Sequence, residues 1–232
     1  MKMNTVMVRT GAIVAILGSL ALAGCSSTGS SSNAATTGRA AEPATKATRI
    51  IDLNVKAKAT RSGEVYLMRG LADIFSRGMD VMAAKLNRAG VFAVSDSYVN
   101  WKEMADDIIA RNKRKEVSYP VVIMGHSLGA NDASKMATYL GENGVRISYV
   151  VTFDPTETGY VGKNIDKVVN YYLPNGKNVV RKGAGFTGKL ENISMDGREE
   201  ITHTTIEKNT GLQGRAIGYI MSITKKLPKK RS

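Results

Sequence analysis

Short apolar runs alternate with longer amphipathic segments from about residue 49 onward. Because each parallel strand needs a crossover before the next one, this alternation predicts an α/β fold in which helices connect the strands of a mostly parallel sheet. We expect an open sheet of six to eight strands with helices on both faces. The expected strands are IIDLNVKA (50–57, at an edge), EVYLM (64–68), VFAVSD (91–96), YPVVIM (119–124), ISYVVTF (147–153), KVVNYYL (167–173) and KLENISM (189–195).

Two of the expected helices carry specific signals. Asn100, with Glu103 three residues later, forms a capping-box pattern, so a helix should begin directly after Asn100. The last helix should begin near residue 211, and its apolar side should carry Leu212, Ala216, Ile220 and Leu227.

The strand 119–124 runs directly into the turn Gly125, His126, Ser127, Leu128, Gly129. In a Gly-x-Ser-x-Gly turn between a strand and a helix, a Cβ at either glycine would collide with the tightly packed backbone. The serine hydroxyl then stands at the carboxyl end of the sheet, where open α/β folds bind ligands. Ser127 is therefore a candidate nucleophile, although a purely structural glycine-rich connection would use the same residue types.

The run GHSLGA (125–130), between a strand and an amphipathic helix, resembles the nucleophile elbow of the α/β-hydrolase family, particularly its lipases and thioesterases. The resemblance extends over most of residues 64–224. It implies a compact α/β-hydrolase-like fold and an acyl-enzyme formed at Ser127, with no metal and no cofactor.

A serine nucleophile needs a base, and the chain has only two histidines. His126 lies inside the elbow, where its side chain should point away from the Ser127 hydroxyl and pack or form a hydrogen bond beneath the turn. By elimination His203, in a loop before the last helix, is the candidate base. In the hydrolase family the histidine also lies in such a loop, late in the chain.

The base in turn needs a carboxylate that fixes its tautomer. Asp154 ends the strand 147–153, and TFDPT resembles the strand-end Asp-Pro of certain lipases. The order Ser127, Asp154, His203 is that of the hydrolase family. Alternatively, Asp154 only caps a turn before Pro155, and the acid is Asp166 at the start of the next strand or Asp196 in a turn.

Two backbone amides should stabilise the oxyanion of an acyl transfer. The Leu128 amide, at a helix amino terminus, is one donor, and by resemblance the Leu71 amide in RGLAD is the other, with Gly70 allowing close approach. Lipases often carry His-Gly-aromatic there, so Arg69 is a departure. It could contact an anionic group of the substrate or pair with an acid such as Asp73.

Only about a dozen residues separate the strand that ends at Asp154 from the next strand. Many hydrolases of this fold insert a lid at this position. We therefore expect a compact domain without a large lid and with a shallow, uncovered active site, as in cutinase-like enzymes.

The first 24 residues have the composition of a secretory signal, with Lys2 and Arg9 ahead of the apolar stretch GAIVAILGSLALA. The following LAGC resembles the lipobox of bacterial lipoproteins, which implies lipidation at Cys25, the only cysteine; a plain signal peptide or a buried thiol is the alternative. We expect a lipidated cysteine and flexible tether over 25–48, a catalytic domain over 49–226 and a basic tail over 227–232.

The net charge is +13, and basic residues cluster at RNKRK (111–115) and KKLPKKR (225–231). These clusters could attract anionic lipid head groups or envelope polymers, or they could be a solvated helix end and a disordered tail. Nucleic acid is not an expected partner, because the export signal separates the protein from it and no aromatic residues interleave the basic runs.

Together these features predict a serine hydrolase of the carboxylic-ester type: an esterase, lipase or thioesterase acting on acyl esters in the bacterial envelope. The protein should be anchored by lipid at Cys25, and Ser26 weakly indicates the outer membrane, facing the periplasm. Two alternatives remain: a non-catalytic lipoprotein that uses the same fold to bind anionic lipid or polymer, and an acyltransferase with the same three side chains.

Overall fold

The computed structural model describes residues 58–71, 76–174 and 178–228. The predicted signal peptide, Cys25, the tether, the edge strand 50–57 and residues 229–232 lie outside the described residues, so the predictions about them stay predictions. No helix in the described ranges is long and apolar enough to cross a membrane.

The main sheet has six strands in the order β2-β1-β3-β4-β6-β8, and every neighbouring pair is parallel. This confirms the mostly parallel α/β sheet, and each expected strand after residue 58 overlaps an observed one. The strands are β1 Glu64–Arg69, β2 Phe92–Ser97, β3 Val121–His126, β4 Ile147–Phe153, β6 Lys167–Tyr172 and β8 Lys189–Ser194.

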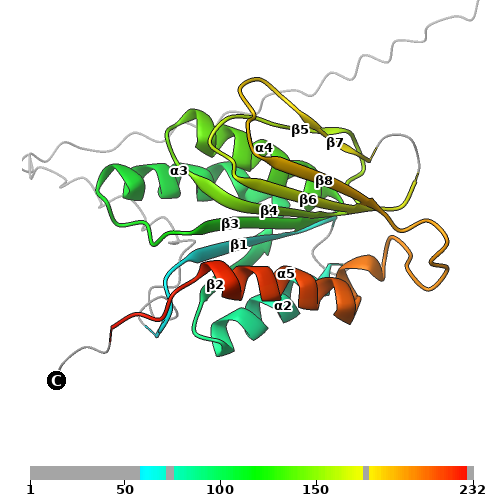
Figure 1. Ribbon diagram of the computed structural model, residues 1–232, viewed down its shortest axis with the longest axis horizontal. Helices are drawn as coiled ribbons and strands as arrows, with labels where there is room; N and C mark the ends of the chain where they lie inside the picture. The colour runs from blue at the N-terminus through cyan, green and yellow to red at the C-terminus, as the bar shows by residue number, and fades with distance from the viewer. Residues whose placement is uncertain (1–57, 72–75, 175–177, 229–232) are drawn as a thin grey trace, which may run out of the picture. The chain divides into compact units, whose positions relative to one another are not determined.

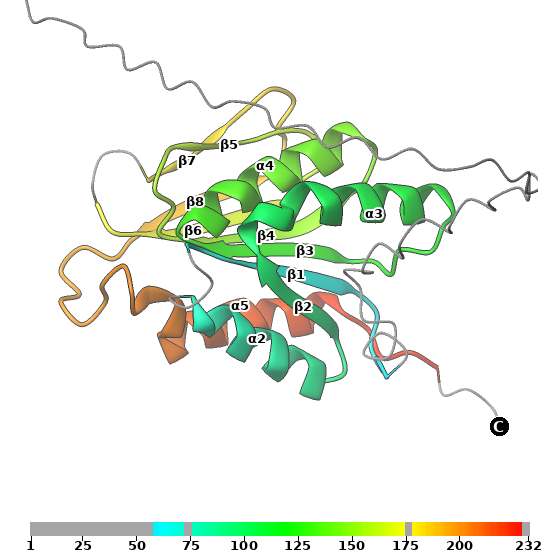
Figure 2. The ribbon, with the colours of Figure 1, turned by 180° about the vertical axis from the view of Figure 1, so that it is seen from behind.

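Two helices cover each face of the sheet (Figures 1 and 2). Helices α2 (Arg77–Arg88) and α5 (Thr210–Ile223) lie on one face, and α3 (Trp101–Lys113) and α4 (Leu128–Glu142) lie on the other. Strand β1 shows why both faces are covered, because Val65 and Leu67 pack with α2 and α5 while Tyr66 and Met68 pack with α3 and α4. A strand buried on both faces must be apolar throughout, which is how a central parallel strand appears in sequence.

The sheet brings the ends of β3 and β4 together. Gly125 pairs with Thr152 and His126 with Phe153, and the Ser127 amide donates to the Phe153 carbonyl at 3.0 Å. The residues that follow these two strands, Ser127 and Asp154, therefore leave the sheet side by side at its carboxyl edge.

Three details differ from the sequence predictions. A second, two-stranded parallel sheet pairs β5 (Gly159–Val161) with β7 (Val180–Lys182); strands this short leave no clear alternating pattern.

The predicted capping box at Asn100 is wrong. Helix α3 does begin after Asn100, but the chain enters it through a 3₁₀ turn, η1 (Tyr98–Asn100), and the Asn100 side chain makes no capping hydrogen bond; its amide donates to Asp96 at 3.2 Å. The prediction for Leu227 is also wrong, because α5 ends at Ile223 and Leu227 lies beyond it, 45% exposed.

Candidate active site

The elbow holds Ser127 in a strained backbone conformation between β3 and α4. Its φ is +58°, which lies in a backbone region that residues other than glycine rarely occupy. A Cβ at Gly125 would overlap the Gly129 carbonyl, and a Cβ at Gly129 would overlap the Met68 carbonyl. Both positions therefore require glycine, and the turn presents the Ser127 hydroxyl at the carboxyl edge of the sheet.

The three side chains singled out in the sequence form one hydrogen-bonded series. His203 Nε2 lies 3.0 Å from Ser127 Oγ, and His203 Nδ1 lies 2.6 Å from Asp154 Oδ2. Because the carboxylate can only accept, Nδ1 carries the proton and Nε2 is free to accept the Ser127 hydroxyl proton. The His203 side chain is 43% exposed, so the imidazole can be reached from outside the protein.

Asp154 is held from two sides. One oxygen bonds His203, and the other accepts from the Leu173 amide at 2.9 Å and from the Asn178 side chain at 2.7 Å. Burial raises the pKa of Asp154, but these three hydrogen bonds outweigh it and hold the pKa below its ordinary value. The carboxylate therefore stays ionised at neutral pH.

The hydrogen bond that His203 donates to Asp154 raises the pKa of His203 above its ordinary 6.5, against the opposing effect of burial. This imidazole is a stronger base than a free histidine. The alternative acids are elsewhere: Asp166 pairs with Arg146 at 3.0 Å at the amino end of β6, and Asp196 is exposed in the turn after β8.

His126 connects the loops around the elbow. Its two ring nitrogens form hydrogen bonds with groups other than the Ser127 hydroxyl. Its Nε2 lies 2.7 Å from the His203 carbonyl oxygen and its Nδ1 lies 2.8 Å from Ser76 Oγ, which accepts from the Gly70 amide at 2.9 Å. Since a carbonyl only accepts, Nε2 carries the proton and Nδ1 accepts from the Ser76 hydroxyl.

Burial lowers the pKa of His126 to about 4, so its ring is neutral near pH 7. Its centroid lies 4.9 Å from that of His203. His126 thus packs beneath the base and links its loop to the loop after β1.

The two expected oxyanion donors differ in how far the structure describes them. Leu128 is the first residue of α4, so its amide belongs to the helix amino terminus. Gly70 lies against the elbow, because a Cβ there would come within 3.0 Å of Ser127 Cβ. Leu71 follows it and is 59% exposed, and the next four residues are outside the described ranges. The role of Leu71 therefore stays a prediction.

Arg69 pairs with an acid, which is one of its two predicted roles; the acid named in the prediction, Asp73, lies outside the described residues, so that pairing stays a prediction. The Arg69 guanidinium contacts Asp80 in α2 at 2.9 Å and donates to the Ser95 carbonyl at 3.2 Å. The pairing fixes the end of β1 to α2 and β2. Asp80 is one helical turn into α2, and only the fold brings it to Arg69.

Sequence reasoning missed three groups of this site: Asn178, Ser76 and the Leu173 amide. Each acts through a loop that approaches the site from another part of the chain, and no motif surrounds any of them. The segment 154–166, all of which is described, contains β5 and no helix, so the compact domain lacks a large lid there.

A parallel sheet that carries a serine at a strand-to-helix elbow defines the α/β-hydrolase class. The model of the lipase (class 3) family matches residues 39–170. The chain therefore belongs to this family. The match includes Ser127 and Asp154 and ends before His203. No curated protein matches the chain.

Solved structures are similar at low identity. The NocB thioesterase domain from the nocardicin cluster is 12% identical, covers 72% of this chain and 96% of its own, and has a TM-score of 0.43. The type II thioesterase BorB from the borrelidin biosynthetic cluster is 11% identical, with 71% and 93% covered and a TM-score of 0.46. Est1E from Butyrivibrio proteoclasticus is 11% identical, with 70% and 90% covered and a TM-score of 0.44.

Proposed function

We propose that this protein is a serine hydrolase that cleaves acyl esters or thioesters, with Ser127 as nucleophile, His203 as general base and acid, and Asp154 as the acid that orients His203. The observation that carries the proposal is the hydrogen-bonded series from Ser127 Oγ through His203 to Asp154 at a glycine-flanked elbow. Membership of the lipase (class 3) family supports ester hydrolysis in general.

The geometry supports a two-step reaction. His203 Nε2 takes the Ser127 hydroxyl proton as Oγ attacks the acyl carbon, and the oxyanion accepts hydrogen bonds from the Leu128 and Leu71 amides. When the tetrahedral intermediate collapses, His203 returns the proton to the leaving alcohol or thiol and an acyl-Ser127 ester remains. Water, deprotonated by His203, then releases the acid. Asp154 stays ionised and stabilises the imidazolium.

The exposure of the His203 side chain affects how large a substrate the site can receive. With 43% of its side chain accessible and no helix between β4 and β6, the site can receive an ester carried on a bulky or surface-bound molecule. We propose that it acts in the bacterial envelope, tethered through a lipidated Cys25. Replacing Cys25 with Ser should release the protein from the membrane fraction, and a membrane-bound C25S protein would contradict the tether.

Turnover of chromogenic acyl esters and thioesters tests the proposed chemistry. Ser127→Ala should abolish turnover in folded protein, because among the described residues the Ser127 hydroxyl is the one that lies against His203 Nε2. Ser222→Ala, which alters an exposed hydroxyl bonded only within α5, is the matched control and should keep full activity. Equal turnover by Ser127→Ala and the unsubstituted protein would exclude this mechanism.

A further inference from the structure

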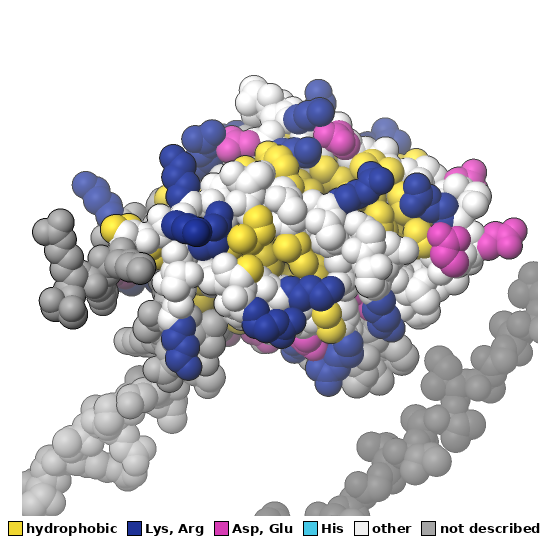
Figure 3. Space-filling model, turned by 60° about the horizontal axis from the view of Figure 1, so that its bottom comes forward, with side chains coloured by type: hydrophobic (Ala, Val, Ile, Leu, Met, Phe, Trp, Pro, Cys, Tyr) yellow, Lys and Arg dark blue, Asp and Glu magenta, His cyan; other side chains and the backbone are white. Residues whose placement is uncertain are grey.

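Exposed cations from separate parts of the chain gather where the strands of the main sheet begin and where the preceding helices end. We call this surface the amino-end face and define it by six exposed residues: Lys58, Arg88, Lys113, Lys115, Lys225 and Lys226. The two basic clusters of the sequence, near 111–115 and 225–231, thus contribute to one surface. In Figure 3, Lys and Arg side chains lie at the left end, where the strands begin in Figure 1, and also across the middle and right of the face shown.

Backbone contacts join these segments. The Thr60 amide donates to the Gly90 carbonyl after α2, and the Leu227 amide donates to the Thr60 carbonyl. The Glu64 amide donates to the Pro120 carbonyl, which fixes the segment after α3 beside the start of β1. The cations therefore lie on one continuous part of the fold rather than on scattered loops.

The charge of this face is poorly compensated. Between described residues, none of the six cations forms an ion pair. Two exposed acids near this face are already paired, Glu116 with Arg114 at 2.8 Å and Asp166 with Arg146 at 3.0 Å, whereas Glu142 at the end of α4 is exposed and forms no ion pair with a described residue. The positive potential of the face is thus available to a partner.

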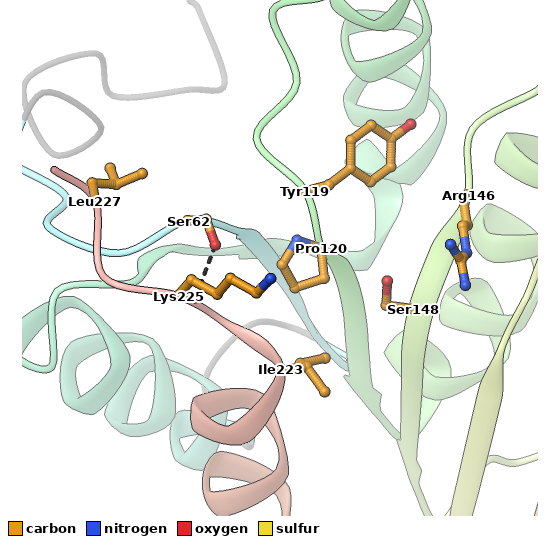
Figure 4. A pocket seen from close by; sticks show the side chains of 8 residues that line it. All are labelled: Ser62, Tyr119, Pro120, Arg146, Ser148, Ile223, Lys225 and Leu227. Carbon is orange, nitrogen blue, oxygen red and sulfur yellow. Dashed lines mark hydrogen bonds between the residues drawn. The ribbon is translucent and has the colours of Figure 1, made fainter.

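A groove of about 680 Å³ crosses the same face (Figure 4). Lys225 and Arg146 stand on opposite walls with Pro120 and Ser148 between them, and Ser62 lies beside Lys225, whose backbone amide donates to the Ser62 hydroxyl at 3.0 Å. Arg146 is already paired with Asp166, so Lys225, which is exposed and lies beside hydroxyl groups, is the cation that could bind a phosphate group in this groove. Tyr119 and Leu227, 39% and 45% exposed, add apolar surface at the rim.

We propose that the amino-end face docks on an anionic phospholipid bilayer, with a lipid phosphate in the groove beside Lys225. A bilayer fits better than a soluble polyanion because it offers an acyl boundary to Tyr119 and Leu227 as well as negative charge to the lysines.

The docking would fix the orientation of the protein. Strands of the observed length span about 20 Å at 3.3 Å per residue, so Ser127 would be held about that far from the bilayer surface. The proposed catalytic site would then act on esters away from the membrane to which the protein is bound.

Co-sedimentation of the full chain with phosphatidylcholine vesicles, with and without phosphatidylglycerol, tests the docking. The gain in binding caused by phosphatidylglycerol isolates charge from any lipid tether. Lys113→Gln, Lys115→Gln and Lys225→Gln together should reduce this gain about 100-fold at low ionic strength, since each cation contributes about fivefold. The control changes Arg77, Lys102 and Arg198 to Gln, which removes the same charge from exposed sites near the other end of the sheet.

An equal loss in the two triple variants would overturn the proposal, as would binding of dextran sulfate with no gain on anionic vesicles. Amide hydrogen exchange of the unsubstituted chain gives an independent readout. Anionic vesicles should protect residues 113–120 and 224–227 and leave the His203 loop unchanged. Protection of the His203 loop instead would contradict the proposed orientation.

Discussion

Two polar networks with the same kinds of groups lie at opposite ends of the sheet. At the carboxyl end, Asp154, His203 and Ser127 combine a carboxylate, a nitrogen base and a hydroxyl. At the amino end, Arg111 contacts Glu64 at 2.8 Å and the Tyr66 hydroxyl at 2.7 Å, and Tyr66 donates to Glu64 at 2.6 Å.

The networks differ in exposure and in the central base. The side chains of Arg111 and Glu64 are 8% and 0% exposed, and a guanidinium keeps its proton at any ordinary pH. Burial raises the pKa of Tyr66, which keeps its proton too. His203 is 43% exposed and can exchange a proton near neutral pH. The buried network at the amino end therefore stabilises the fold. The network at the carboxyl end can support chemistry, because its base is accessible and can gain or lose a proton.

The strongest test of this contrast removes the titratable base. His203→Ala should lower kcat for a chromogenic ester by about 10⁴- to 10⁶-fold, because Ser127 loses its proton acceptor. The midpoint of thermal unfolding should change little, since the ring is partly exposed. A variant that keeps most of its turnover would remove His203 from the proposed mechanism.

The opposite network should respond in the opposite way. Arg111→Met removes the cation that compensates the buried Glu64 carboxylate. Among the described residues, this leaves Glu64 only uncharged hydrogen-bond partners such as the Tyr66 hydroxyl, so the free energy of unfolding should fall by about 3 to 5 kcal/mol in urea titrations. Turnover per folded molecule should stay unchanged. Arg114→Met, which removes an exposed partner of Glu116, is the control and should leave unfolding unaffected. Lost turnover in folded Arg111→Met protein would contradict the conclusion that this network stabilises the fold without taking part in catalysis.

His126 offers a finer test, because it is as buried as the amino-end network but contacts the His203 loop. His126→Phe keeps a ring and leaves the His203 carbonyl and the Ser76 hydroxyl without this partner. A small displacement of the base should lower kcat by about 10- to 100-fold with little change in KM. His126→Gln, which can still donate to the carbonyl, should recover part of the loss. A change in stability with no change in kcat would assign His126 to packing alone.

The smallest expected effect is on the pH profile. Catalysis needs neutral His203, so kcat/KM should rise with pH as His203 loses its proton. Because Asp154 raises the pKa of His203, the half-maximal point should lie above the ordinary 6.5. Asp154→Asn removes the charge that favours the imidazolium, so the residual activity should titrate at lower pH. If kcat/KM of that variant rises over the same pH range as that of the unsubstituted protein, Asp154 does not set the pKa of His203.

The sequence predicted the sheet well because its central strands are buried on both faces. β1 and β3 contain the apolar runs 65–68 and 121–124, and β4 is apolar except at Ser148 and Thr152; such segments can be recognised without knowledge of their neighbours. The spatial order of the strands and the pairing of β5 with β7 were not predicted, because they depend on tertiary contacts. The capping prediction at Asn100 failed because Asp96, four residues earlier, takes its side chain.

The candidate site could be reached by elimination, since two histidines left one free base. Local patterns sufficed for Ser127 and Asp154, which directly follow strands. The supporting groups could not be found this way: Asn178 reaches Asp154 from a loop beyond β6, and Ser76 serves His126 rather than capping α2. Such roles depend on how loops meet, which no local pattern records.

Covalent labelling of Ser127 tests the central claim most directly. A fluorophosphonate should react with the folded protein, and mass spectrometry should find the adduct on Ser127 in the peptide that contains GHSLGA. Labelling should be lost in Ser127→Ala and strongly slowed in His203→Ala, while Ser222→Ala labels normally. If folded protein takes up no probe, or carries it on another serine, Ser127 is not the activated nucleophile and the proposed mechanism is contradicted.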